Sequence, residues 1–207
     1  FFVTNIESEE QYIDRMAAAS GKYHAVILVD RSELSKRLKA AFADAWLKTN
    51  PDFSAEEMEI SFREKLSVLS GHNHKQDHII FLALNSFNSE SVRSFIHPST
   101  PIYATSLVFG NKDPAYVERL EAVRFIDMPW LIQPELAPVQ HYHSPNMPTD
   151  ISLQRFYALG IDAFQLAQKI LEYRSPETIV LDGVSGFIHP SLPGHFNRRL
   201  IPAIFKK

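Results

Sequence analysis

Two short stretches of the chain are almost continuously apolar. Residues 25–29 are apolar throughout, and residues 78–84 are apolar after the initial histidine. Strands that are buried on both faces have this pattern, which is typical of a parallel sheet covered by helices. Residues 101–108 and 124–127 are shorter and β-rich and predict two further strands, and residues 58–62 predict another.

The segments between these strands have the period of amphipathic helices. The strongest of them places Leu34, Leu38, Phe42, Ala45 and Trp46 on one face. Capping residues mark where helices begin, most clearly at residues 113–114, where Asp suits the N-cap and Pro the first helical position. The other helices are predicted after the capping sequences at residues 8–11 and 30–33, at residues 63–70 and 88–96, and from Asp150 or Ser152 to Arg174.

Strands and helices therefore alternate along the first part of the chain, which predicts the α/β class. Right-handed crossovers between parallel strands give a three-layer α/β/α arrangement with a mainly parallel sheet. The alternation stops at residues 128–130, because the proline of this Met-Pro-Trp sequence cannot donate to a sheet. A proline-rich crossing at residues 133–150, the long helix, extended pieces at 178–181 and 186–189, and a tail at 198–205 follow it.

Length and composition exclude several classes of protein. A chain of 207 residues suits one domain or two small lobes of one. The net charge of −3, without a face rich in Lys and Arg, argues against nucleic acid as a partner. No apolar run approaches the ~20 residues of a membrane span. The chain has no Cys, which excludes disulfides, and no initiator Met, so we expect a piece of a longer protein with any targeting segment upstream.

Histidine is the first residue type to consider as candidate chemistry. His72, His74 and His78 surround Asp77, and residues 141–143 form a His-x-His pair. Metal ligands have such spacings, but histidine is also common in polar loops and proline-rich linkers. Because the chain has neither Cys nor a His-Glu-x-x-His helix, we predict no metal site and no cofactor.

Two other motifs resemble catalytic or phosphate-binding sequences only superficially. Residues 30–32 follow a strand and open a helix, where backbone N–H groups can hold an anion. No glycine-rich phosphate loop accompanies them, so a capped helix is the favoured interpretation. Residues 183–186, Gly-Val-Ser-Gly, lack the spacing of a Gly-x-Ser-x-Gly nucleophile elbow and predict a turn.

The carboxyl ends of the predicted strands carry the remaining candidates for a ligand cleft. Ligands of open α/β sheets bind at this edge. The default interpretation of such residues is structural, as helix caps, hinge anchors or, for the tryptophan, hinge packing. The candidate residues are Asp30, Ser32, Asn85, Ser106, Asp127 and Trp130.

Several segments, in a fixed order, resemble one known family. They are PIYATS at residues 101–106, RFIDMPWLIQP at 124–134, RFYALGIDAFQLA at 155–167, LDGVSGFI at 181–188 and RRL at 198–200, with HIIFLALNS at 78–86 preceding them. Together they resemble the C-terminal domain of the LppC/LpoA lipoproteins, which are anchored in the outer membrane and activate a class A penicillin-binding protein. The resemblance spans most of the chain from about residue 25 and is weakest at residues 58–75.

The resemblance implies a type I periplasmic-binding-protein-like fold of two α/β lobes. Residues 8–127 would form one complete lobe, and residues 128–207 the hinge crossing, the long helix and a β-like tail that return to a partial second lobe. The long helix carries an apolar stripe of Phe156, Gly160, Ala163, Phe164, Ala167 and Ile170. We predict that this stripe packs on the remaining sheet or on a second copy, which exposure of both phenylalanines in a monomer would contradict.

The resemblance further implies a non-catalytic regulator at the periplasmic face of the outer membrane, with a lipid anchor upstream. Its partner would be a class A penicillin-binding protein, with peptidoglycan as a further candidate. An alternative is a solute-binding or sensory module of the same fold, which binds an amino acid or a cell-wall fragment. An enzyme is the third hypothesis, since folds of this class host many chemistries. The family offers no motif for the partner-contact residues.

Overall fold

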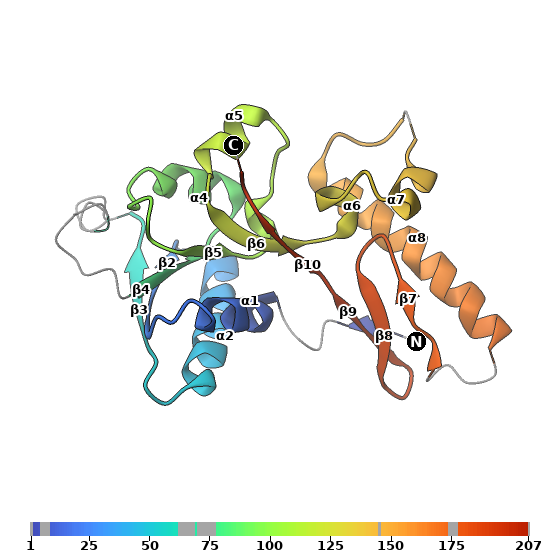
Figure 1. Ribbon diagram of the computed structural model, residues 1–207, viewed down its shortest axis with the longest axis horizontal. Coiled ribbons are helices and arrows are strands. Elements are labelled where there is room, and N and C mark those ends of the chain that lie inside the picture. Colours follow the sequence, from blue (N-terminus) through green and yellow to red (C-terminus); the bar gives the residue numbers. More distant parts are fainter. Residues whose placement is uncertain are drawn as a thin grey trace. The chain divides into compact units, whose positions relative to one another are not determined.

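The computed structural model describes residues 2–4, 9–61, 69, 78–144, 146–173 and 178–206. The chain folds into two compact units (Figure 1). Unit 1 comprises Phe1–Glu7 and Asp127–Pro202, and unit 2 comprises Ser8–Ile126 and Ala203–Lys207. The predicted division into a complete lobe at residues 8–127 and a partial one at 128–207 stays a prediction.

Unit 2 is built on the predicted parallel sheet. The sheet has six strands in the order β10-β6-β5-β4-β2-β3. The pairs β3–β2, β2–β4, β4–β5 and β5–β6 are all parallel. The strands are β2 (His24–Val29), β3 (Ser54–Glu59), β4 (His78–Ala83), β5 (Ile102–Ala104), β6 (Val123–Asp127) and β10 (Ile201–Ile204). The predicted α/β class with a mainly parallel sheet is confirmed.

Helices cover both faces of this sheet. They are α1 (Glu9–Ala18), α2 (Glu33–Thr49), α4 (Ser86–Arg93) and α5 (Pro114–Arg119). Figure 1 shows α1 and α2 on one side of the sheet and α4 and α5 on the other, which is the predicted three-layer arrangement. The buried Phe42 of α2 stacks on Phe81 of β4 with ring centroids 4.1 Å apart. The predicted caps Ser32 and Asp113 accept backbone N–H groups at the starts of α2 and α5.

Two of the sequence-based assignments in unit 2 are wrong. The strand predicted at residues 58–62 is β3, which begins at Ser54 and ends at Glu59. It is an edge strand in which three of the six residues are exposed and none is buried, so a polar sequence such as SAEEME can form it. Residues 106–108, predicted as strand, form the 3-10 helix η2 (Ser106–Val108), since the pairing of β5 with β4 ends at Ala104. The helix predicted at residues 63–70 lies, except for residue 69, outside the described residues.

The described residues of unit 1 form a second, smaller sheet and three helices. Its strand order is β1-β9-β8-β7, with β1 parallel to β9 and the other pairs antiparallel. The elements are β1 (Phe2–Thr4), β7 (Leu181–Asp182), β8 (Phe187–Leu192), β9 (His195–Arg199), α6 (Pro129–Ile132), α7 (Ala137–Tyr142) and α8 (Ile151–Glu172). The proline-rich crossing predicted at residues 133–150 contains a helix that the sequence did not indicate, α7, whose proline lies in the first turn, where it is tolerated. Asp150, one of the two predicted caps of α8, accepts the Leu153 N–H.

Most of the predicted stripe of α8 does not lie on the face that packs on the small sheet, although its last member, Ile170, packs against the core cluster. Ile151, Ala158, Asp162 and Leu166 are buried, and Leu166 joins a core cluster with Ile179, Leu181, Ile188 and Phe196. Phe156 and Phe164 are 69% and 65% exposed in the single chain. The prediction that the stripe packs on the remaining sheet is therefore wrong, because α8 is apolar on two faces and its period alone does not select one. The alternative of a second copy stays a prediction.

Candidate functional site

A hollow of about 580 Å³ lies at the carboxyl ends of β2 and β3, where α2 and α4 begin. This is the edge at which open α/β sheets bind ligands. One wall is polar, and the other is formed by apolar side chains of α4 and of the segments around it. The lining residues are Asp30, Arg31, Glu59, Ile60, Ser61, Phe87, Asn88, Ser91, Val92 and Phe95.

Asp30 organises the polar wall. One carboxylate oxygen accepts the Ser32 N–H at 2.9 Å, and the other accepts the Asn88 side-chain amide at 2.7 Å. Partial burial raises the pKa of the Asp30 carboxyl, but the hydrogen bonds from Ser32 and Asn88 outweigh it and hold the pKa below its ordinary value. Asp30 is therefore ionised at neutral pH, and it links the start of α2 to α4.

Asn88 brings three of the predicted residues together. Its side chain donates to Asp30, and its backbone N–H donates to the side chain of Asn85, the N-cap of α4. Ser32 is the N-cap of α2 and donates its N–H to Asp30. Ser106 is buried at the start of η2 and lines neither this hollow nor the next.

Charged side chains form the outer part of the same wall. Arg31 Nε lies 2.7 Å from Glu59 Oε1, and the Ser61 hydroxyl donates to the same oxygen at 2.6 Å. The Arg31 side chain is 81% exposed, so this ion pair is worth little to stability, and the guanidinium is accessible to a ligand.

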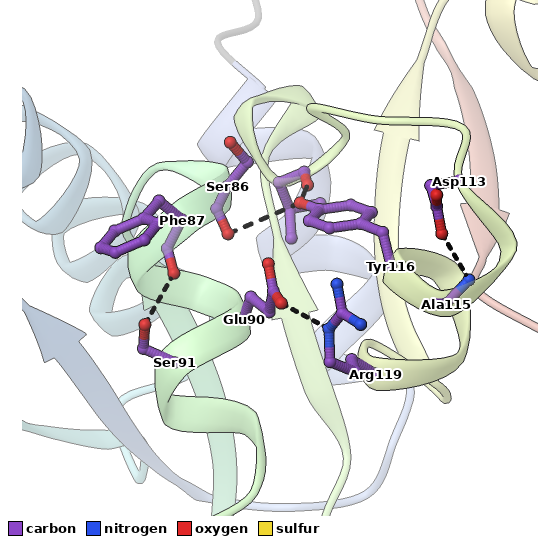
Figure 2. Close-up of polar contacts among 9 residues, drawn as sticks. Ser86, Phe87, Glu90, Ser91, Asp113, Ala115, Tyr116 and Arg119 are labelled. Atoms are coloured by element: carbon purple, nitrogen blue, oxygen red, sulfur yellow. Dashed lines mark hydrogen bonds and ion pairs between the residues drawn. The ribbon is translucent and has the colours of Figure 1, made fainter.

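A second hollow, of about 550 Å³, lies between α4 and α5. Figure 2 shows the polar contacts among residues of this region, including the pair of Glu90 and Arg119. Arg119 of α5 pairs with Glu90 of α4, and the Arg93 guanidinium donates to the backbone oxygens of Glu121 and Ile96. The lining residues are Phe87, Glu90, Ser91, Arg93, Ser94, Glu118, Arg119 and Glu121. Most of these side chains are charged, so this hollow suits a polar partner rather than an apolar ligand.

Phe87 is the functional candidate that the sequence did not indicate. Its side chain is 74% exposed, and it lines both hollows, as does Ser91. Helix α4 is thus the wall between the hollows, with one aromatic ring at the surface. Aromatic residues, including Phe, are enriched at protein–protein interfaces relative to the rest of the protein surface. A search of the sequence for polar residues at strand ends does not find such a residue.

Asp127 and Trp130 belong to unit 1, and the contacts described for them lie within that unit. Asp127 is 1% exposed and accepts hydrogen bonds from Arg155 Nη2 at 2.6 Å and Nε at 3.2 Å. Trp130 is fully buried, and its ring stacks on His143 with centroids 5.3 Å apart. A ring in this position packs against the protein rather than against a ligand, which is the hinge-packing alternative raised from the sequence.

The described residues include no group of three or more potential metal ligands. The His143 ring packs on Trp130, and the His141 ring packs edge-on against Tyr142. His72, His74 and Asp77 lie outside the described residues. No helix in the described part of the chain combines the length and the apolar character needed to cross a membrane.

Comparisons with known proteins agree with this architecture. A sequence model of the family described as "LppC putative lipoprotein" matches residues 55–199. A "Penicillin-binding protein activator LpoA" from Glaesserella parasuis is 25% identical over 189 residues, which cover 88% of this chain and 32% of that protein. The protein of the same name from Histophilus somni is 28% identical over 171 residues, covering 78% of this chain and 28% of that protein. The chain thus spans about a third of the length of these curated relatives.

Solved structures show the same fold. A "putative branched-chain amino acid ABC transporter" from Chromobacterium violaceum superposes with a TM-score of 0.81 at 29% identity, covering 98% of this chain and 66% of that chain. The LpoA C-domain from Haemophilus influenzae superposes with a TM-score of 0.72 at 17% identity and covers 98% and 65%. The fold is periplasmic-binding-protein-like, and since the family match extends over more than half of the sequence, the chain belongs to the LppC family.

Proposed function

We propose that the protein containing this chain is a non-catalytic activator of a class A penicillin-binding protein, a peptidoglycan synthase. The observation that carries the proposal is the LppC match over residues 55–199 together with relatives named penicillin-binding protein activators. The contacts of the strand-end residues are consistent with it, because Asp30, Ser32 and Asn85 serve loop and cap geometry rather than a reaction.

We place the protein at the periplasmic face of the outer membrane, held by a lipid anchor outside residues 1–207. The description of the family as lipoproteins supports this location. Peptidoglycan is the second partner that we propose, because the synthase acts on it.

The test is a binding experiment with the purified full-length protein and its cognate class A synthase. We expect the synthase to be retained on the immobilised protein and its transpeptidase rate to rise. Retention without stimulation, or no retention, would contradict an activator role. A synthase of another class serves as the control and should not be retained.

A second candidate function is solute binding in the hollow beside Asp30. The hollow combines an ionised carboxylate, the Arg31–Glu59 pair and the exposed Phe87 ring, so it suits a small zwitterionic or amide-containing molecule. The name of the Chromobacterium violaceum neighbour supports the same class of ligand.

Thermal-shift screening with amino acids and muropeptides tests this candidate. A ligand present at 100 times its Kd should stabilise the protein by about 2.7 kcal/mol. Phe87→Ala should abolish the shift without changing the unliganded midpoint, because the ring is exposed. Phe164→Ala removes a similarly exposed ring outside both hollows and should leave the shift intact. A flat screen leaves the activator as the only proposal.

A further inference from the structure

The segments that carry the family resemblance are far apart in the sequence but supply one buried polar cluster in unit 1. Residues 124–134 contribute Asp127, residues 155–167 contribute Arg155 and Asp162, and residues 181–188 contribute a turn. Arg198, from the last of these segments, lies close enough for its charge to act on both carboxyls. None of these residues lines either of the hollows.

Asp127 and Arg155 form the first half of the cluster. Two nitrogens of the Arg155 guanidinium reach the two oxygens of Asp127, and the Met128 N–H adds a hydrogen bond of 2.8 Å. The Arg155 side chain is 17% exposed and the Asp127 side chain 1%. A paired, largely desolvated guanidinium and carboxylate hold a fixed mutual geometry.

Asp162 forms the second half, by binding a backbone turn. Its two oxygens accept the N–H groups of Val184 and Ser185 at 2.9 and 2.7 Å. Successive N–H groups that point to one spot make a concave site for an anion. Gly183 and Gly186 close the predicted turn with reciprocal backbone hydrogen bonds. The backbone N–H of Trp130 donates to the backbone oxygen of Val184 at 2.9 Å. Helix α8 is thereby connected to α6 through the turn.

The charges of the cluster balance. Two aspartates that are each 1% exposed face two arginines, Arg155 of α8 and Arg198 of β9. Burial raises the pKa of both carboxyls, while hydrogen bonds from Arg155 to Asp127 and from Ser185 to Asp162 oppose the rise. Removing one member of such a buried, charge-balanced cluster is strongly destabilising, because it leaves an uncompensated buried charge.

We infer that this cluster is a structural joint that fixes the chain where it enters and leaves unit 1, and that the family-like segments encode this joint rather than a ligand or partner site. Asp127 is the first residue of unit 1 after unit 2, and Arg198 precedes the return at Pro202 by four residues. The joint holds the start of α6 next to α8 through the pair of Asp127 and Arg155, and it holds the turn at residues 183–186 next to α8 through Asp162. This role does not depend on the function proposed above.

A double-mutant cycle in the full-length protein tests the joint. Hydrogen exchange of the Trp130, Val184 and Ser185 amides is compared in the wild type, Asp127→Asn, Arg155→Met and the double variant. Arg155→Met leaves a buried carboxylate without its partner, so we expect exchange at these amides to accelerate about ten- to a hundredfold at neutral pH. The double variant should exchange more slowly than Arg155→Met, because it no longer buries that charge.

The pH dependence of Arg155→Met provides an independent measurement. The groups that face Asp127 are then Arg198 of β9 and the Met128 N–H, so the folded-state pKa rises further above the ordinary value of about 3.9. A carboxyl whose folded-state pKa is raised lowers the stability of the fold very little at a pH below its unfolded-state pKa. The loss of stability grows as the pH rises toward the folded-state pKa. The acceleration should therefore be small near pH 4 and large near pH 8.

A matched control replaces an exposed ion pair. Arg31→Met removes the partner of Glu59 in unit 2 and should change no amide of unit 1. Two results would overturn the joint. One is unchanged hydrogen exchange in Arg155→Met, and the other is a double variant whose loss of protection free energy equals the sum of the losses in the two single variants. Asp162→Asn tests whether global unfolding explains the effect. This variant should accelerate hydrogen exchange of the Val184 and Ser185 amides, while the amides of β2 and β4 keep their protection.

Discussion

Replacement of Trp130 by alanine is expected to lower the free energy of unfolding of unit 1 by about 3–5 kcal/mol. The indole is fully buried, and it contacts the rings of His143 and Tyr157 at centroid distances of 5.3 and 5.6 Å. Alanine removes these contacts and leaves a cavity. The backbone at residue 130 cannot move into this cavity, because its N–H is held by the hydrogen bond to the Val184 oxygen. Chemical denaturation followed by far-UV circular dichroism measures the loss.

Phe156→Ala is the matched control for this substitution. Phe156 lies on the neighbouring surface of α8 and is 69% exposed, so its loss should change stability by less than about 0.5 kcal/mol. Any ligand that binds beside Asp30 should bind both variants equally. A Trp130→Ala protein with wild-type stability and impaired ligand binding would instead make the indole a binding residue and contradict its packing role.

Gly183→Ala should be destabilising by a comparable amount, about 3–5 kcal/mol, for a different reason. A Cβ atom at this position would lie 2.3 Å from Oδ2 and 2.8 Å from Oδ1 of Asp162. The carboxylate would have to withdraw from the Val184 and Ser185 N–H groups, and hydrogen bonds to a charged group contribute about 1.5–3 kcal/mol each. The change in midpoint of thermal unfolding, with the same sample at two scan rates, measures the effect.

Gly160→Ala controls for the general effect of adding a methyl group. A Cβ at Gly160 meets nothing within 4 Å, and alanine is the better helix former, so this variant should be neutral or more stable by up to about 1 kcal/mol. Equal effects of the two glycine substitutions would contradict the close approach of Gly183 to Asp162.

The parts of the fold that were predicted correctly are those where burial on both faces leaves a continuous apolar run. Strands β2 and β4 are of this kind, and their neighbours in the sheet follow from right-handed crossovers. β3 was misplaced because an edge strand is largely solvated and carries a polar sequence. The exposed face of α8 was mistaken for the buried one, because buried Asp162 is polar while exposed Phe156 and Phe164 are apolar.

The candidate site was predictable only in part. The strand-end rule found Asp30 and Asn85, which both accept hydrogen bonds from Asn88, and Ser32, which donates its N–H to Asp30. It missed Phe87, whose importance comes from exposure between two hollows and has no local sequence signal. It also grouped Asp127 with Asp30, whereas Asp127 pairs with Arg155, 28 residues away in the sequence. Such long-range pairs depend on the path of the chain, which residue type alone does not determine.

We propose that the protein containing this chain activates a peptidoglycan synthase without catalysing a reaction itself. The most direct measurement is the rate of peptide cross-linking by the cognate class A penicillin-binding protein on lipid-linked precursor, with and without the purified full-length protein. We predict that the cross-linking rate rises with added protein and saturates, and that the protein alone produces no cross-links. An unchanged cross-linking rate at saturating protein, with the synthase active, would contradict the activator role.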